Sequence, residues 1–384
     1  MSQAEKPREI SGGRKALYFA ILIFFFVLVA EGLLSIYFYQ KGGAEKLASI
    51  EALKTIKRSF ASEPTAINVP HQQLVRPDSS EAVNRKIAEE TVLSNKFVHQ
   101  SWVEYRNVDF NGTYMRMEGP VRRSIPSSYF NPTATDTIDI YFFGGSTMFG
   151  FNVQDQESIP SRFVEFYKHK YPTGKSIRVH NYGNPTYYTY QELMLFTDLV
   201  YSGHQPDVVV FLDGLNDFWF ATASYYRQSY FSYIFRQVFN RGLRSKGDMR
   251  FIDTADAMFK DPKTVPLDVY ESGLVDNYFE NVKNIRMMAD MVGAKSYFFC
   301  QPSPFYNYPN QQNDPMCFKD TNTRFNRIYP MVEKRANELQ NFTFLGNMLK
   351  NEKGYPFVDG LHYSPKFIDK LTGEMMRQMR IEEW

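Results

Sequence analysis

Short apolar segments alternate with amphipathic ones along most of the chain, from about Thr137 to the C-terminus. The short segments are continuous apolar runs, which are typical of strands that are buried on both faces of a sheet. They lie at residues 138–143, 177–180, 208–212, 296–300 and 342–345.

The segments between these predicted strands have apolar residues at helical spacing. They lie at residues 159–170, 191–201, 275–291, 324–339 and 365–380. Alternation of strands and helices predicts a three-layer α/β/α fold, in which helices cover both faces of a parallel sheet. Candidate chemistry is expected just after the strands, because ligand sites in such folds gather at the carboxyl ends of the strands.

The N-terminal part of the chain has a different pattern, a long apolar run at residues 16–39 that predicts a transmembrane anchor. The run is uncharged up to Ala30 and continues past Glu31 to Tyr39. Lys and Arg are denser before the run than after it, which predicts a cytoplasmic tail at residues 1–15 and a periplasmic or extracellular catalytic domain. A signal peptide cleaved after Ala30 is the alternative, and the apolar continuation to Tyr39 favours a retained anchor.

Two further regions separate the anchor from the main domain. Residues 40–100 have helical spacing with interspersed Glu and Lys and a proline-bearing interruption, which predicts a helical stalk or linker. Residues 101–136 change to short alternating pieces bounded by turn signals, which predict a β-rich edge subdomain. The main domain is then expected at residues 137–384.

The amino-acid composition says little about which molecules the protein binds. The net charge of +2 and the 22% of charged residues give no indication of nucleic-acid binding. Histidine, cysteine and carboxylate residues show no cluster with ligand spacing, so neither a metal nor another cofactor is expected. Cys300 and Cys317 are the only cysteines, and their spacing alone leaves open whether they form a disulfide.

Aromatic residues are abundant and gather in a predicted insertion at about 218–272. The insertion predicts either an aromatic surface beside the cleft or a satellite core under a long loop. In the first case Trp219 and Tyr225 are candidate substrate contacts. Gln301, which follows the fourth predicted strand, is a further candidate contact.

Three glycine-bearing or polar segments follow the first three predicted strands. Residues 144–147 are Gly-Gly-Ser-Thr, and the two glycines allow a sharp turn that presents the Ser146 hydroxyl. A helix cap is the structural alternative for this serine. The backbone N–H groups of Ser146 and Gly183 and the side-chain amide of Asn216 would together supply three donors to an oxyanion.

His362 lies three residues after Asp359, in a turn-like segment before the last predicted helix. A histidine that titrates near neutrality can take the serine proton and return it to a leaving group. Asp359 would accept from the other ring nitrogen and fix the tautomer. A capped helix start is the structural alternative, but with Ser146 the pair indicates a serine hydrolase or acyltransferase.

These blocks resemble the SGNH (GDSL-like) hydrolase family, in particular its membrane-anchored bacterial type. The resemblance covers about residues 138–380, with Gly-Gly-Ser in place of the commoner Gly-Asp-Ser. It implies a flavodoxin-like domain and metal-free ester hydrolysis or acyl transfer. The residues that carry it are Ser146, Gly183, Asn216, Asp359 and His362.

The expected function is that of a membrane-anchored serine esterase or O-acyltransferase. Its expected substrates are acyl esters, above all acetyl esters, of an envelope or extracellular polysaccharide, cleaved through an acyl-serine intermediate. Expected partners are thus an acylated carbohydrate or another small ester, and the membrane. A lipid or thioester acyl hydrolase is a close alternative, and a non-catalytic binding or assembly component that retains the fold is an alternative of a different class.

Overall fold

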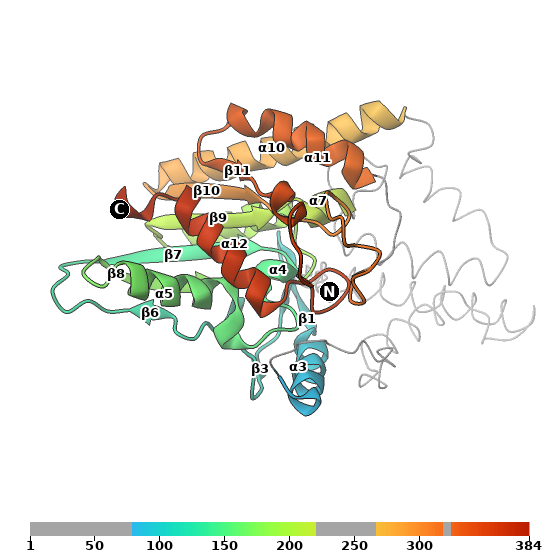
Figure 1. Cartoon of the computed structure of the whole chain (residues 1–384). Coiled ribbons are helices and arrows are strands. Elements are labelled where there is room, and N and C mark those ends of the chain that lie inside the picture. The colour runs from blue at the N-terminus through green and yellow to red at the C-terminus, as the bar shows by residue number, and fades with distance from the viewer. Residues whose placement is uncertain (1–78, 220–265, 318–323, 384) are drawn as a thin grey trace, which may run out of the picture. The chain divides into compact units, whose positions relative to one another are not determined.

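A sheet of nine strands runs through residues 79–219, 266–317 and 324–383, which are the residues that the computed structural model describes. Its parallel part has the order β11-β10-β9-β7-β8 (Figure 1). In chain order this is 2-1-3-4-5, the order of flavodoxin-like folds. The parallel strands are β7 (Thr137–Gly144), β8 (Ser176–Asn181), β9 (Val208–Asp213), β10 (Lys295–Cys300) and β11 (Phe342–Phe344).

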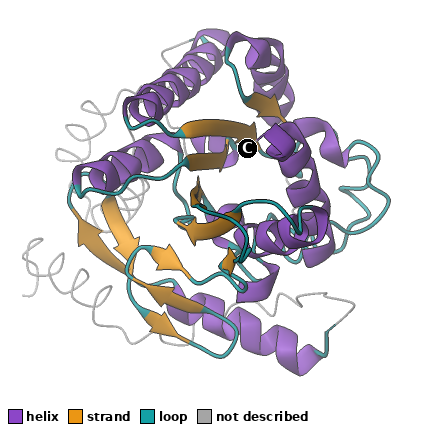
Figure 2. Ribbon diagram, turned by 90° about the vertical axis from the view of Figure 1, so that its left-hand side faces the viewer, coloured by secondary structure: helices purple, strands orange, loops and turns teal. Residues whose placement is uncertain are grey.

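Helices cover both faces of this sheet, as the sequence predicts (Figures 1 and 2). One face carries α5 and α12, and the other carries α6, α10 and α11. Side chains alternate along β7, so Phe142 packs into the core under α5 and α12, whereas Phe143 packs into the core on the opposite face. The helices are α5 (Ile159–Lys170), α6 (Thr189–Tyr201), α10 (Leu267–Met291), α11 (Arg324–Arg335) and α12 (Pro365–Gln378).

The sheet is mixed, which corrects the expectation of a purely parallel sheet. Short antiparallel strands within residues 110–129 extend the main sheet beyond β8, whereas residues 104–107 belong to a separate two-stranded sheet. The connections between these short strands are tight turns, which can join antiparallel neighbours but cannot make a parallel crossover. The added strands are β3 (Phe110–Asn111), β4 (Arg116–Glu118), β5 (Val121–Arg122) and β6 (Ser128–Tyr129).

The last part of the predicted stalk belongs to the same folded unit. Helix α3 (Glu81–Ser94) ends before residue 100, and β1 (Phe97–Gln100) then pairs with β2 (Glu104–Asn107). Glu90, a buried residue of α3, accepts hydrogen bonds from the backbone N–H groups of residues 113–115. These three bonds fasten the helix to the antiparallel edge of the sheet.

Several predicted features lie outside the described residues. These are the anchor at 16–39, the stalk up to residue 78 and most of the aromatic insertion, including Tyr225. Over residues 79–219, 266–317 and 324–383, no helix has the length and apolarity that crossing a membrane requires.

Candidate active site

Ser146 is the first residue of the short helix α4 (Ser146–Phe149), which follows β7 directly. Its backbone N–H has no acceptor within the helix, because the first N–H groups of a helix lack one. The preceding residue, Gly145, lies so close to the loop after β9 that a Cβ there would be 2.4 Å from the amide nitrogen of Asn216. The glycine therefore lets the serine turn and the asparagine amide approach each other.

The structure brings Ser146, His362 and Asp359 together. The Nε2 atom of His362 is 2.8 Å from the Oγ of Ser146, and its Nδ1 atom is 2.7 Å from Oδ2 and 2.9 Å from Oδ1 of Asp359. The His362 side chain is 15% exposed and that of Asp359 is 6% exposed. The serine and histidine are thus reached by solvent, while the carboxylate is covered.

The hydrogen-bond partners fix the tautomer of His362. A carboxylate only accepts hydrogen bonds, so the proton lies on Nδ1 and is donated to Asp359. The Nε2 atom then carries a lone pair and accepts the hydrogen bond from the Ser146 hydroxyl. This is the arrangement in which an imidazole takes a proton from a serine nucleophile.

The surroundings of Asp359 favour its ionised form although the side chain is buried. Burial alone would raise its pKa, but the adjacent His362 and the hydrogen bonds that the carboxylate accepts lower the pKa below its ordinary value. Two of these bonds come from the backbone N–H groups of Leu361 and His362, at 2.9 and 2.8 Å. The turn that brings Asp359 to His362 therefore also stabilises the negative charge.

Two residues of the loop after α4 complete the surroundings of the acid and base, and no sequence motif marks them. Asn152 donates from Nδ2 to Oδ2 of Asp359 at 2.5 Å. The ring of Phe151 stacks on the imidazole of His362, with centroids 4.5 Å apart. Their only sequence signal is proximity, since both lie within six positions of Ser146.

Asn216 and Gly183, the other two predicted donors of the oxyanion hole, each make a hydrogen bond within the protein. The Nδ2 atom of Asn216 lies beside Gly145 and donates to the carbonyl of Tyr187 at 2.7 Å, which uses one of its two hydrogens and fixes the direction of the other. Gly183, by contrast, donates its N–H to Oδ1 of Asn181 at 3.0 Å. A Cβ on Gly183 would meet the backbone nitrogen of Phe149 at 2.4 Å, so this glycine serves close packing against α4.

The candidate substrate contacts have structural roles in the described part of the chain. Gln301 is 3% exposed and accepts a hydrogen bond from the Thr147 hydroxyl at 2.8 Å, so it holds the serine turn rather than lining a cleft. The ring of Trp219 packs against Phe305 and Phe325, at centroid distances of 5.0 and 6.2 Å. Tyr225 lies outside the described residues.

Buried carboxyl groups lie beneath the loop that carries Asn216. Asp217 accepts hydrogen bonds from the backbone N–H and hydroxyl of Thr189 and from the N–H of Gly214, and burial raises its pKa to about 6. Glu192 and Asp213 are also buried, and burial raises the pKa of both groups well above the ordinary range. Desolvation is the largest cause in both groups, and for Glu192 the nearby Asp213 carboxyl adds to it.

Cys300 and Cys317 are buried, and no disulfide joins them. In the described ranges, no group of three or more His, Cys, Asp and Glu side chains is arranged to hold a metal ion.

Comparison with known proteins gives similarity at the level of solved structures. No family model matches the sequence, and no curated protein matches it. An acetylxylan esterase from Geobacillus stearothermophilus is similar over 63% of this chain and 94% of its own, with 18% identity and a TM-score of 0.37. An acetyl xylan esterase (62% and 98%, 15% identity, TM-score 0.39) and a candidate GDSL-like lipase from Parabacteroides merdae (65% and 98%, 14% identity, TM-score 0.39) are also similar.

Proposed function

We propose that the chain is a serine esterase or O-acyltransferase of the SGNH type. The observation that carries the proposal is the continuous hydrogen-bonded series from Ser146 through His362 to Asp359. A protein that only binds or assembles would have no need for a histidine whose tautomer is fixed toward a serine hydroxyl. The non-catalytic alternative is therefore disfavoured.

The reaction begins when Nε2 of His362 takes the proton of Ser146 as its Oγ attacks the ester carbonyl. Negative charge develops on the carbonyl oxygen, and the N–H of Ser146 and the second amide hydrogen of Asn216 are the available donors to it. The imidazolium then gives its proton to the departing alkoxide, which leaves an acyl-serine. Water, or a hydroxyl of an acceptor molecule, attacks this intermediate by the same steps in reverse.

Asp359 supports both proton transfers without itself taking a proton. Its lowered pKa keeps the carboxylate charged when the imidazolium forms beside it. The hydrogen bonds from the backbone of residues 361 and 362 hold its Oδ1 atom during the transfers.

The experiment that tests the proposal compares the full-length protein in detergent with its Ser146→Ala variant on p-nitrophenyl acetate. The proposal predicts that turnover falls to the background rate in the variant while thermal stability is kept. Equal turnover by the two proteins would remove Ser146 from the mechanism.

We propose small acyl esters of an envelope or extracellular polysaccharide as the natural substrates, with residues 16–39 as a membrane anchor. The support for this location is the apolar sequence pattern and the excess of Lys and Arg before it. Phosphatase fusions at the two ends test the orientation, and an active C-terminal fusion is expected only if that end is exported. Comparing the rates on p-nitrophenyl acetate and p-nitrophenyl octanoate, and testing acetylated xylan as a substrate, separates carbohydrate esters from lipid esters. Analysing the products formed from acetylated xylan in the presence of an acceptor sugar separates hydrolysis from acyl transfer.

A further inference from the structure

The loop between α4 and the next turn of helix lies against the acid and the base at once. The Asn152 amide is bonded to Asp359, and the neighbouring Phe151 ring stacks on His362. Asn152 is 7% exposed, so its side chain is enclosed with the carboxylate that it contacts. This contact comes from a segment near Ser146 in the sequence, more than 200 positions before Asp359.

The backbone of this loop is held in an uncommon conformation by a buried arginine. Gly150 and Asn152 both have left-handed backbone angles, with φ of 84° and 62°. Arg122, which is fully buried in β5, donates to the carbonyls of Phe149 and Val153 at 2.5 and 2.6 Å and also to the carbonyl of Gly150. The guanidinium therefore binds the loop on both sides of Asn152.

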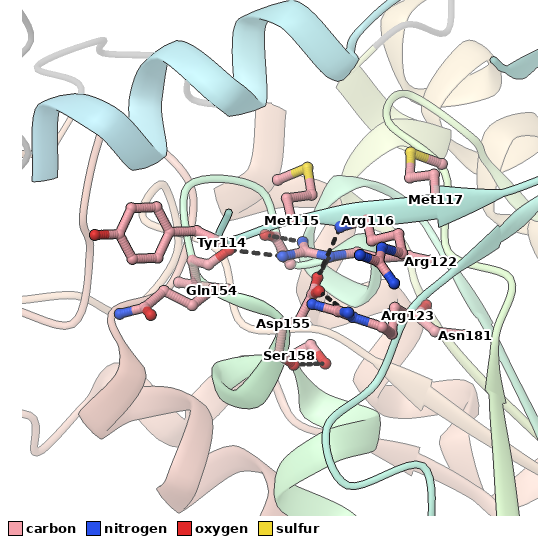
Figure 3. A network of polar contacts seen from close by, with 12 residues as sticks. Tyr114, Met115, Arg116, Met117, Arg122, Arg123, Gln154, Asp155, Ser158 and Asn181 are labelled. Carbon is pink, nitrogen blue, oxygen red and sulfur yellow. Dashed lines mark hydrogen bonds and ion pairs between the residues drawn. The ribbon is translucent and has the colours of Figure 1, made fainter. Parts of the chain in front are cut away.

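The arginine is in turn neutralised within its own network, which Figure 3 shows. Arg122 lies 3.4 Å from Asp155, and Arg123 lies 2.7 Å from the other oxygen of the same carboxylate. The backbone N–H of Arg116 also donates to the Asp155 carboxylate. The backbone of the loop is thus held by contacts that do not involve Asp359, and it carries the Asn152 side chain to the carboxylate.

The two oxygens of Asp359 have different partners. Oδ1 accepts from the backbone N–H groups of residues 361 and 362, whereas Oδ2 accepts from Asn152 and makes the shorter contact with the imidazole. Removing the amide would leave Oδ2 with the imidazole as its hydrogen-bond partner, so that rotation of the carboxylate about χ2 would be restricted from the Oδ1 side and by the imidazole.

We propose that Asn152 is a positioning residue of the acid and base: its amide fixes the rotation of Asp359 that presents Oδ2 to His362, and Arg122 holds the loop that carries the amide. The proposal rests on the proposed function of Ser146, His362 and Asp359. It assigns part of the site to β5, in the antiparallel edge of the sheet, in addition to the parallel strands.

The test is the isosteric substitution Asn152→Asp. The new side chain has the same shape and tolerates the left-handed backbone, but it has no amide N–H and brings a second carboxyl group against Asp359. The two carboxyl groups share a proton at low pH, and once it has left they repel each other and put a second negative charge next to His362. We expect kcat on p-nitrophenyl acetate to fall about tenfold at neutral pH, with KM little changed, since one bond to a charged group is lost. We also expect the rising limb of the pH–kcat profile to move about one pH unit higher, because added negative charge favours the protonated imidazole.

Asn307→Asp is the matched control. Asn307 also has a left-handed backbone, with φ of 47°, and its exposed amide donates to Asn347. This variant should keep the kcat and the pH profile of the unchanged protein. If Asn152→Asp does not fold, as judged by near-ultraviolet circular dichroism, Asn152→Ala serves with the same measurement of kcat.

A second readout does not depend on turnover. The proton on Nδ1 of His362 should give a far-downfield ¹H NMR signal, which we expect to shift or vanish in N152D and to stay in place in N307D. An unchanged signal together with an unchanged kcat and pH profile in N152D would overturn the inference. Failure of the proposed function would look different, since the full-length protein would then show no turnover that depends on Ser146.

Discussion

Nε2 of His362 lies 2.8 Å from Oγ of Ser146, although 216 positions separate the two residues in the chain. Ser146 directly follows β7, in the middle of the sheet, and His362 lies in the turn before α12, which packs beside α5 on one face. The fold therefore assembles the pair, and neither segment could do so alone. The groups around this contact determine whether His362 can take the proton of Ser146.

Asp359→Asn should lower kcat by about 10³ to 10⁴-fold, with little change in KM. An amide can donate to Nδ1, which would move the imidazole proton to Nε2 and leave no lone pair for the serine hydroxyl. Steady-state kinetics on p-nitrophenyl acetate measures the loss. Asp369→Asn is the control, because Asp369 makes only a surface pair with Arg162, and a comparable loss in that variant would show that the effect is unspecific.

Gly145→Ala should have a larger effect on kcat than on the free energy of unfolding. The added Cβ would lie 2.4 Å from Nδ2 of Asn216, so the amide must move away from the serine turn. Loss of one oxyanion donor typically costs about 10² to 10³-fold in kcat. Gly373→Ala in α12 is the matched control, since a Cβ there meets nothing within 4 Å. Wild-type kcat in the Gly145→Ala variant would argue against Asn216 as a donor.

Arg122→Met should destabilise the fold by about 3 to 5 kcal/mol, because it leaves Asp155 buried with reduced compensation and strips three carbonyls of their donor. Urea unfolding followed by circular dichroism measures the change. Arg178→Ala removes an exposed ion pair with Asp139 and should cost no more than about 1 kcal/mol. Similar losses in both variants would contradict the role given to the buried arginine.

The buried carboxyl pair predicts how stability depends on pH. Burial raises the pKa values of Glu192 and Asp213, so the folded state holds a proton that the unfolded state loses above about pH 4. Stability is therefore complete below that pH and falls as pH rises toward the raised folded pKa, by about 1.4 kcal/mol per unit for each proton.

Glu192→Gln should flatten this decline, because it removes one of the two carboxyl groups whose pKa burial raises. Urea unfolding between pH 5 and 8 measures the slope for both proteins. Glu280→Gln, on the exposed surface of α10, should leave the slope unchanged, because its partner Lys283 keeps its charge over this range. A decline of equal steepness in the Glu192→Gln variant would contradict the role given to the buried Glu192 carboxyl.

The sequence was sufficient to predict the parallel part of the fold. The five apolar runs correspond to β7 to β11, and the helix at 159–170 has the predicted bounds, because buried parallel strands and amphipathic helices carry strong periodic signals. Helix α10 begins at Leu267, before the predicted 275, since its first turns carry polar residues that resemble an insertion. That the short antiparallel strands join the main sheet could not be predicted, because strands of two or three residues do not show which sheet they join.

Site residues that lie in recognisable sequence motifs could be predicted. Residues that join the site only through tertiary contacts could not. Ser146, His362 and Asp359 are brought together, and Asn216 lies beside the serine turn. The direction of the Gly183 N–H depends on a local turn with Asn181, which a motif does not encode. Asn152 and Arg122 have no motif at all, and their contacts arise only when β5 meets the loop after α4.

Covalent labelling of the full-length protein with a fluorophosphonate tests the central claim most directly, because the probe reacts with serines activated by a neighbouring base. The account predicts one adduct per chain, found by mass spectrometry on the peptide that contains Ser146 and absent from a His362→Ala variant. An unlabelled chain, an adduct on a different serine, or equal labelling without His362 would contradict it.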